Sequence, residues 1–158
     1  MILLLKTKRL WDGRMEPKAD IEQLLRDGNT VETAINGYSV YPMLVPGRDN
    51  VIVAPLEDRK LKRGDVVLYR RDGSILVLHR IWRVRQEGVY MVGDNQTQIE
   101  GPLRPEQMRG ILVGFIRKGK RISVRNLPYR FYAAVWLRLR PVRHKAAVAV
   151  HFIKVCGR

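Results

Sequence analysis

The sequence predicts a mainly β domain with a short helix near its N-terminus and a basic, amphipathic helical segment at its C-terminus. Three observations lead to this fold class. Short apolar runs recur between Gly, Asp and Pro turn signals, which is typical of antiparallel sheets. Apolar residues at helical spacing precede the first of these runs and follow the last. The chain of 158 residues is also long enough to bury the core of one domain.

The N-terminal helix is predicted over residues 19–27. Ile21, Leu24 and Leu25 recur at helical spacing and fall on one face. Gly28-Asn29 follows them and is a typical helix stop. A short helix followed at once by a strand is a compact way to support whatever the strand leads into.

Strands are expected where apolar residues alternate or run together between turn signals. They are predicted over residues 30–35, 51–54, 66–70, 75–84, 89–92, 111–116 and 122–124. Asp72-Gly73 is a strong signal for a tight hairpin between two of them. The run 75–84 begins apolar on both faces, as a central buried strand does. The stretch 93–108 contains prolines and is predicted to be a loop.

Residues 1–126 are therefore assigned to the β domain and residues 127–158 to a basic helical tail. In this tail Phe131, Val135 and Leu139 share a face and are flanked by arginines. Pro141 breaks or kinks the helix, and a helical pattern resumes over 142–155. Such a stripe either lies in a membrane interface or covers the β domain. The charges recur too often for a spanning helix.

The net charge of +15 is unevenly distributed, because no Asp or Glu follows Glu106. The asymmetry indicates an anionic partner, with a membrane surface bound through residues 129–155 as the favoured one. Nucleic acid is the less favoured partner, and a solvated basic tail is the third interpretation. Cys156 is the single cysteine, so no intrachain disulfide is expected. No motif for a metal or nucleotide is recognised, and no cofactor is expected.

The stretch around Ser39 contains a hydroxyl between two conformationally special residues. Gly37 precedes Ser39 by two positions and Pro42 follows it by three. Glycine permits a sharp turn and a close backbone approach, whereas proline fixes its own backbone angle. A serine nucleophile needs such a constrained turn, with backbone N–H groups near its hydroxyl. An ordinary Gly/Ser/Pro loop is the alternative interpretation.

Three further motifs follow Ser39 in a characteristic order. Gly64-Asp65-Val66-Val67 leads into a strand, His79-Arg80-Ile81 lies in the predicted central strand, and Gly93-Asp94-Asn95 follows the next one. Together with the serine turn, this order resembles the signal peptidase/LexA superfamily of serine peptidases. The histidine resembles the endoplasmic-reticulum and archaeal type of signal peptidase, whereas bacterial signal peptidases and LexA use lysine. The resemblance covers residues 37–119 and implies a coiled β-sheet fold.

The resemblance implies a Ser-His site that cleaves a peptide, a leader or a partner protein. Ser39 would be the nucleophile and His79 the general base, because imidazole titrates near neutral pH. Asp94 would orient His79, unless it only caps its own loop, and Glu100 is the alternative orienting acid. The backbone N–H of Ser39 would be the first oxyanion donor. For His79, the alternative is a histidine satisfied within the core.

The sequence departs from the family at its N-terminus and beside Ser39, where Tyr38 is bulkier than the small residue of signal peptidases. The apolar run 1–5 ends at Lys6, far short of a signal peptide or a membrane anchor, so we expect a cytoplasmic or peripheral membrane protein. Val40 also stands where the family usually has methionine. Two alternatives to a peptidase follow: an inactive binding or regulatory module with the same fold, or a basic lipid- or nucleic-acid-binding protein. A LexA-like repressor is not supported, because no helix-turn-helix precedes Ser39.

Overall fold

The prediction of a mainly β protein is confirmed by the computed structural model, which describes residues 6–7, 20–57, 59–71, 75–140 and 142. Its strands are β1 (Lys6–Thr7), β2 (Val31–Ala34), β3 (Asp49–Ala54), β4 (Val66–Arg70), β5 (Leu76–Arg85), β6 (Gly88–Val92), β7 (Glu100–Leu103), β8 (Met108–Arg117) and β9 (Lys120–Ser123). The helices are α1 (Ile21–Arg26), α2 (Leu127–Arg138) and the 3-10 turn η1 (Pro105–Gln107).

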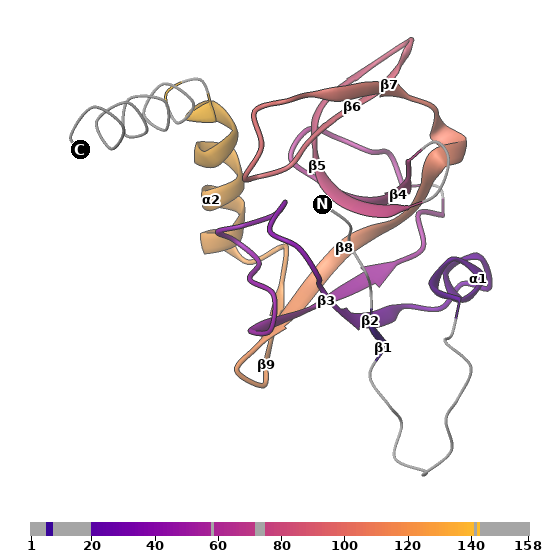
Figure 1. Ribbon diagram of the computed structural model, residues 1–158, viewed down its shortest axis with the longest axis vertical. Helices are drawn as coiled ribbons and strands as arrows, with labels where there is room; N and C mark the ends of the chain where they lie inside the picture. Colours follow the sequence, from indigo (N-terminus) through magenta and orange to yellow (C-terminus); the bar gives the residue numbers. More distant parts are fainter. Residues whose placement is uncertain (1–5, 8–19, 58, 72–74, 141, 143–158) are drawn as a thin grey trace, which may run out of the picture.

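The strands of the described part form one sheet in the order β1-β2-β3-β8-β4-β5-β6-β7, with β9 paired to β8. Every pairing is antiparallel. The long β8 joins the two halves, because its first residues pair with β4 and its last with β9, while β3 runs along its other edge. Figure 1 shows β8 crossing the molecule diagonally, with β4–β7 curling at one end.

The helix α1 forms where the sequence predicts it, with ordinary end signals. The Asp20 carboxylate accepts the N–H of Glu22 at 3.0 Å and so caps the first turn. Gly28 has φ +82°, a conformation that glycine adopts easily and that ends the helix. Ile21 and Leu25 are buried against the sheet, so one apolar face holds α1 in place.

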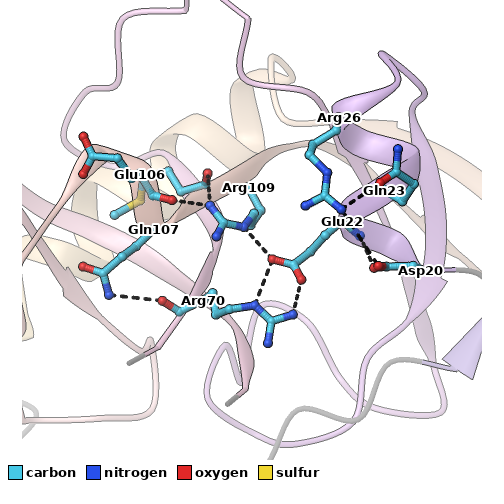
Figure 2. Close-up of polar contacts among 9 residues, drawn as sticks. Asp20, Glu22, Gln23, Arg26, Arg70, Glu106, Gln107 and Arg109 are labelled. Atoms are coloured by element: carbon cyan, nitrogen blue, oxygen red, sulfur yellow. Dashed lines mark hydrogen bonds and ion pairs between the residues drawn. The ribbon is translucent and has the colours of Figure 1, made fainter. Parts of the chain in front are cut away.

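A buried carboxylate anchors the same helix to two strands. Glu22 is 5% exposed and accepts hydrogen bonds from Arg70 of β4 and Arg109 of β8 (Figure 2). The hydrogen bond from Arg70 is the main cause that lowers the pKa of Glu22, against the opposing effect of burial. Glu22 is therefore charged at neutral pH and ties α1 to the centre of the sheet.

Two apolar clusters divide the interior. The first lies between α1, β2, β3, β8 and α2 and includes Val31, Ile35, Val40, Leu44, Val51, Leu68, Leu112, Phe115 and Tyr129. The second lies inside the curl of β4–β7 and includes Val67, Tyr69, Val77, Ile81, Val89, Met91, Leu103 and Met108. Residues of β4 and β5 alternate between the clusters, so a single strand contributes to both cores.

The structure departs from the sequence prediction between β6 and β8. The predicted loop 93–108 contains the strand β7 and the turn η1. Pro102 is tolerated in β7 because this strand is the last in the sheet order, where no further ladder needs its missing N–H. The Asp72-Gly73 turn and nearly all of the predicted continuation over 142–155 lie outside the described residues.

The helix α2 packs on the β domain through a face other than the stripe of Phe131, Val135 and Leu139, so that stripe does not cover the domain. Tyr129, Ala133 and Leu137 are buried at 7%, 8% and 5% exposure. The predicted stripe points outward instead: Phe131 is 73% exposed and Leu139 is 44% exposed. The predicted tail thus begins as a packed helix that also presents an apolar outer face.

Candidate active site

The turn that carries Ser39 is fixed to the domain by its neighbours. Val40 and Leu44 are 0% and 1% exposed and insert into the first cluster, whereas Ser39 is half-buried. The Asp49 carboxylate accepts the N–H of Val45 at 2.9 Å. Arg117 of β8 donates to Asp49 at 2.9 Å. The constrained turn predicted for Ser39 is therefore present, held by apolar and ionic anchors.

Asp49 is the ionic anchor of this turn. Its side chain is 0% exposed and accepts hydrogen bonds from Arg48 and Arg117. Burial alone would raise the pKa of Asp49, but the hydrogen bonds from Arg117, Arg48 and the Val45 N–H outweigh it and lower the pKa to about 2. The carboxylate therefore stays charged across the neutral range.

His79 lies in the most buried part of β5. The residue is 2% exposed, between β4 and β6. Its ring nitrogen Nδ1 lies 3.0 Å from the Tyr69 hydroxyl. Burial lowers the pKa of His79 to about 4; Glu100 opposes this shift and Arg71 adds to it. The imidazole is therefore neutral at physiological pH, which a general base requires.

Glu100 approaches this histidine through Tyr69. The Tyr69 hydroxyl donates to Glu100 Oε2 at 2.8 Å, and Arg71 Nε donates to Glu100 Oε1 at 2.7 Å. In a flat sheet, β4 and β7 would lie about 14 Å apart at ~4.8 Å per strand. The contact therefore depends on the curl of β4–β7, which brings both strands to one interior.

Gly93 brings the Ser39 turn to the strand beside His79. Arg80 pairs with Val92, so the antiparallel register continues to Gly93 opposite His79. Any other residue at position 93 would place its Cβ atom 2.7 Å from the Ser39 carbonyl oxygen, which is a steric clash. Glycine has no Cβ atom and so permits this close approach. The N–H of Asn95 donates to the same oxygen at 3.0 Å. The backbone of Ser39 therefore contacts Gly93 and Asn95, which directly follow β6.

Ser39 lies in a turn outside the sheet, its backbone contacts Gly93, and no hydrogen bond joins its side chain to His79. Neither the Ser39 hydroxyl nor the Ser39 N–H bonds to any described residue. The same holds for His79 Nε2 among the described residues. A hydroxyl, a backbone donor and an imidazole nitrogen thus have no hydrogen-bond partner among the described residues. In serine hydrolases the hydrogen bond between the serine and its base is often long until substrate is bound.

Asp94 does not occupy the orienting position that the sequence predicts for it. Its carboxylate binds the Arg80 guanidinium through two parallel hydrogen bonds of 2.8 and 2.7 Å. The partner of His79 Nδ1 is Tyr69. Arg80 points to the opposite side of β5 from His79 because side chains alternate along a strand. The acid in the Gly93-Asp94-Asn95 motif therefore neutralises an arginine, and its predicted role beside His79 has no support in this geometry.

Sequence reasoning missed Tyr69, the residue in contact with His79. The signal was available in the pairing of the predicted hairpin. Tyr69 pairs with Val77 and Val67 pairs with His79, so Tyr69 and His79 share a face on adjacent strands. Glu100 was predicted only as the alternative orienting acid, and it reaches His79 through Tyr69. Among the described residues, no group of three or more His, Cys, Asp or Glu could hold a metal ion.

Comparison with protein-family models, with curated protein sequences and with solved structures finds no significant match for this chain. Within the described residues, none of the helices has both the length and the apolar composition needed to cross a bilayer.

Proposed function

We propose that this chain is a serine peptidase with the coiled sheet of the signal peptidase/LexA superfamily, in which Ser39 is the nucleophile and His79 the general base. The observation that carries the proposal is the contact between the Ser39 carbonyl and Gly93, opposite His79 in the sheet. Two motifs distant in sequence thereby meet at one end of β6. Acyl transfer needs a serine hydroxyl within reach of a neutral imidazole, and the approach of the Ser39 backbone to the strand beside His79 supports such a pairing.

The chemistry follows from the groups left unpaired. His79 Nε2 takes the hydroxyl proton as Ser39 Oγ attacks the peptide carbonyl carbon. The Ser39 N–H stabilises the oxyanion, and one such donor is typically worth about 3–4 kcal/mol of barrier. The leaving amine receives the proton from His79. Water, deprotonated by the same nitrogen, then hydrolyses the acyl ester of Ser39.

The substrate class is an extended peptide segment, and the surface beside Ser39 supports this. Tyr38 and Tyr41 flank the serine turn and are 50% and 43% exposed. Their rings pack edge to face with centroids 6.2 Å apart. Exposed aromatic rings offer apolar area for the side chains of a bound peptide. We expect them to favour apolar residues next to the cleaved bond.

The site of action proposed here is an anionic membrane surface. Leu127 and Phe131 lie one helical turn apart on α2 and are 74% and 73% exposed. The exposed Arg130 and Arg138 lie on the same helix and form no ion pair with a described residue. Apolar anchors next to unpaired arginines match a leaflet of anionic lipid, where each basic residue is worth roughly 1 kcal/mol.

The decisive experiment compares wild type with Ser39→Ala and His79→Ala on a peptide library, with cleavage read by mass spectrometry in the presence of anionic vesicles. Both variants should lose cleavage by roughly 10²-fold or more, as expected for loss of the nucleophile or its base. Ser123→Ala is the matched control, because Ser123 is exposed on β9. Equal cleavage by wild type and both variants would refute the dyad. Absence of cleavage by wild type would favour an inactive module with the same fold.

A further inference from the structure

We propose that Tyr69 and Glu100 are positioning residues that hold the His79 imidazole in the tautomer whose unprotonated nitrogen is Nε2. The inference rests on the proposed peptidase function only for its catalytic consequence. The tautomer itself is a property of the folded protein. It follows from counting protons along the chain of contacts from Glu100 to Tyr69 and on to His79.

The count starts at Glu100, which is an acceptor only. Arg71 grips its carboxylate with Nε at 2.7 Å and with a second nitrogen on the other oxygen. Burial would raise the pKa of Glu100, but the hydrogen bonds from Arg71 and Tyr69 outweigh it and lower the pKa. An ionised carboxylate has no proton to donate. The 2.8 Å contact with Tyr69 therefore requires a proton from the tyrosine.

Tyr69 has a single hydroxyl hydrogen, which it donates to Glu100 in a hydrogen bond. Burial and the neighbouring carboxylate raise the pKa of Tyr69 well above its ordinary value, so the hydroxyl stays protonated. With its single hydrogen directed to Glu100, the phenol oxygen can only accept from another partner. The other partner is His79 Nδ1 at 3.0 Å. Nδ1 must therefore carry a proton.

A neutral imidazole has one N–H, so a proton on Nδ1 leaves a lone pair on Nε2. Nδ1 is occupied by Tyr69, and Nε2 is the nitrogen without a partner among the described residues. The relay thus presents the basic nitrogen of His79 to whatever enters beside Ser39. A carboxylate acting through a phenol replaces the directly bound acid of a Ser-His-Asp triad.

The test reads the tautomer directly. Protein labelled with 15N-histidine is measured at pH 7 by long-range 1H–15N correlation, and His79 is assigned by loss of its signals in His79→Gln. The wild type should show a protonated Nδ1 and an unprotonated Nε2. In Glu100→Ala the Tyr69 hydroxyl loses its acceptor and turns to Nδ1, so the ring proton should move to Nε2. In Glu100→Gln the side-chain carbonyl still accepts from Tyr69, so the wild-type pattern should remain.

Tyr69→Phe removes the link and should raise the fraction protonated on Nε2. Tyr90→Phe is the matched control, since the hydroxyl of Tyr90 on β6 donates to Glu87 in the turn before that strand; it should change nothing. A wild-type spectrum with the proton on Nε2 would overturn the proposal. So would a Glu100→Ala spectrum equal to that of wild type. The wild-type measurement decides the matter even if a variant fails to fold.

Kinetics separate this proposal from the peptidase proposal. Tyr69→Phe and Glu100→Ala should lower kcat by roughly 10²-fold with little change in KM, and Glu100→Gln should recover most of the rate. If cleavage is independent of Ser39 and His79, the peptidase proposal fails whatever the tautomer is. If cleavage needs both residues but the wild-type proton lies on Nε2, only the relay fails.

Discussion

Arg80 and Asp94 form a buried ion pair that joins the middle of β5 to the loop in contact with Ser39. Both side chains are 1% exposed, and the guanidinium meets the carboxylate at 2.7 and 2.8 Å. Arg80 also donates to the Gly64 carbonyl at 2.8 Å and to the Tyr129 hydroxyl at 3.3 Å. A single arginine therefore connects β5, the turn before β4, the Gly93–Asn95 loop and α2.

Asp94→Asn should destabilise the protein far more than an average substitution. The change leaves Arg80 charged and buried without its counter-ion, which typically costs about 3–5 kcal/mol. We expect this loss in the free energy of unfolding from urea denaturation. The matched control is Glu87→Gln in the exposed Arg85–Glu87 pair, where both side chains are about half exposed. An ion pair this exposed to solvent contributes little to stability, so this variant should unfold like wild type.

The same variant distinguishes the two roles considered for Asp94. An orienting acid would leave stability nearly unchanged and lower kcat under conditions where the protein is fully folded. The buried pair with Arg80 predicts the reverse: a large loss of stability, and activity that follows the folded fraction. The structural role would be contradicted if Asp94→Asn lowered the free energy of unfolding no more than Glu87→Gln does but lowered kcat strongly.

Gly93→Ala should disable the site while leaving the fold intact. The added Cβ would lie 2.7 Å from the Ser39 carbonyl and 2.7 Å from Gln96 Oε1. The glutamine side chain can swing away, but the carbonyl moves only with the serine turn. A displacement of about 1 Å at a reacting group can lower the rate by roughly 10²-fold. Overpacking of this kind typically costs about 1–3 kcal/mol of stability.

Gly119→Ala is the control for this prediction. Gly119 has φ +75° and no atom within 4 Å of its Cβ position, in the turn between β8 and β9. Alanine there strains the backbone without touching the serine turn, so stability should fall by about 1 kcal/mol with unchanged kcat. If Gly93→Ala retains the wild-type rate, the contact between Ser39 and Gly93 does not position the nucleophile.

The course of β2 to β6, the central burial of β5 and the constrained turn at Ser39 could all be predicted from local sequence. Each depends on neighbours in the chain: apolar alternation, Gly and Pro signals, and the hairpin between β4 and β5. The chain of contacts from His79 through Tyr69 to Glu100 could not be predicted in this way, because the Glu100–Tyr69 contact arises from the curl of the whole sheet. The amount of curl is set by bulges and packing across strands, which a linear pattern does not reveal.

The partner of Asp94 and the buried face of α2 could not be predicted for a related reason. A motif gives the order of residues but not the side of the strand to which each one points. Asp94 reaches Arg80 on the first-cluster side of β5, whereas His79 faces the second cluster. In α2 the residue pattern supports two apolar stripes. The stripe of Tyr129, Ala133 and Leu137 is the one buried, and this depends on how the helix packs on the sheet.

The acid limb of the pH–rate profile should lie near pH 4. His79 must be unprotonated to act as a base, and burial lowers the pKa of its imidazole to about 4 from an ordinary value of ~6.5. kcat/KM should therefore stay constant below neutrality and fall only as pH approaches about 4. An inflection near ~6.5 would show that the imidazole is solvated or that another base acts.

The same shift has a consequence for stability, which must be measured alongside. The pKa of His79 is lowered in the folded state. Its contribution to the free energy of unfolding is therefore complete above pH ~6.5 and is lost as the pH falls toward about 4. The unfolded chain binds the proton first. Circular dichroism at each pH identifies the range in which the protein is folded. An NMR titration of His79 in Ser39→Ala gives the pKa of the imidazole without turnover.

Removing the apolar anchors of α2 should weaken binding to anionic vesicles. Leu127 and Phe131 are 74% and 73% exposed, and full burial of such a side chain contributes roughly 1.5–3 kcal/mol. Replacing both with serine should lower the affinity for phosphatidylserine-containing vesicles by roughly 10-fold or more. Val84→Ser is the matched control, because Val84 is also an exposed apolar residue, at 44%, but lies on β5. Flotation of the vesicles measures the bound fraction.

The arginines of the same helix predict the lipid preference. Arg130 and Arg138 are exposed, and no Asp or Glu follows Glu106 to oppose them. Substituting each with glutamine should reduce binding to anionic vesicles, leave any weak binding to neutral phosphatidylcholine vesicles unchanged, and flatten the dependence on salt. A gel shift with DNA and RNA completes the comparison. Strong nucleic-acid binding without flotation would mean that this basic face recognises phosphate on a polynucleotide, because its exposed apolar residues would then contribute nothing.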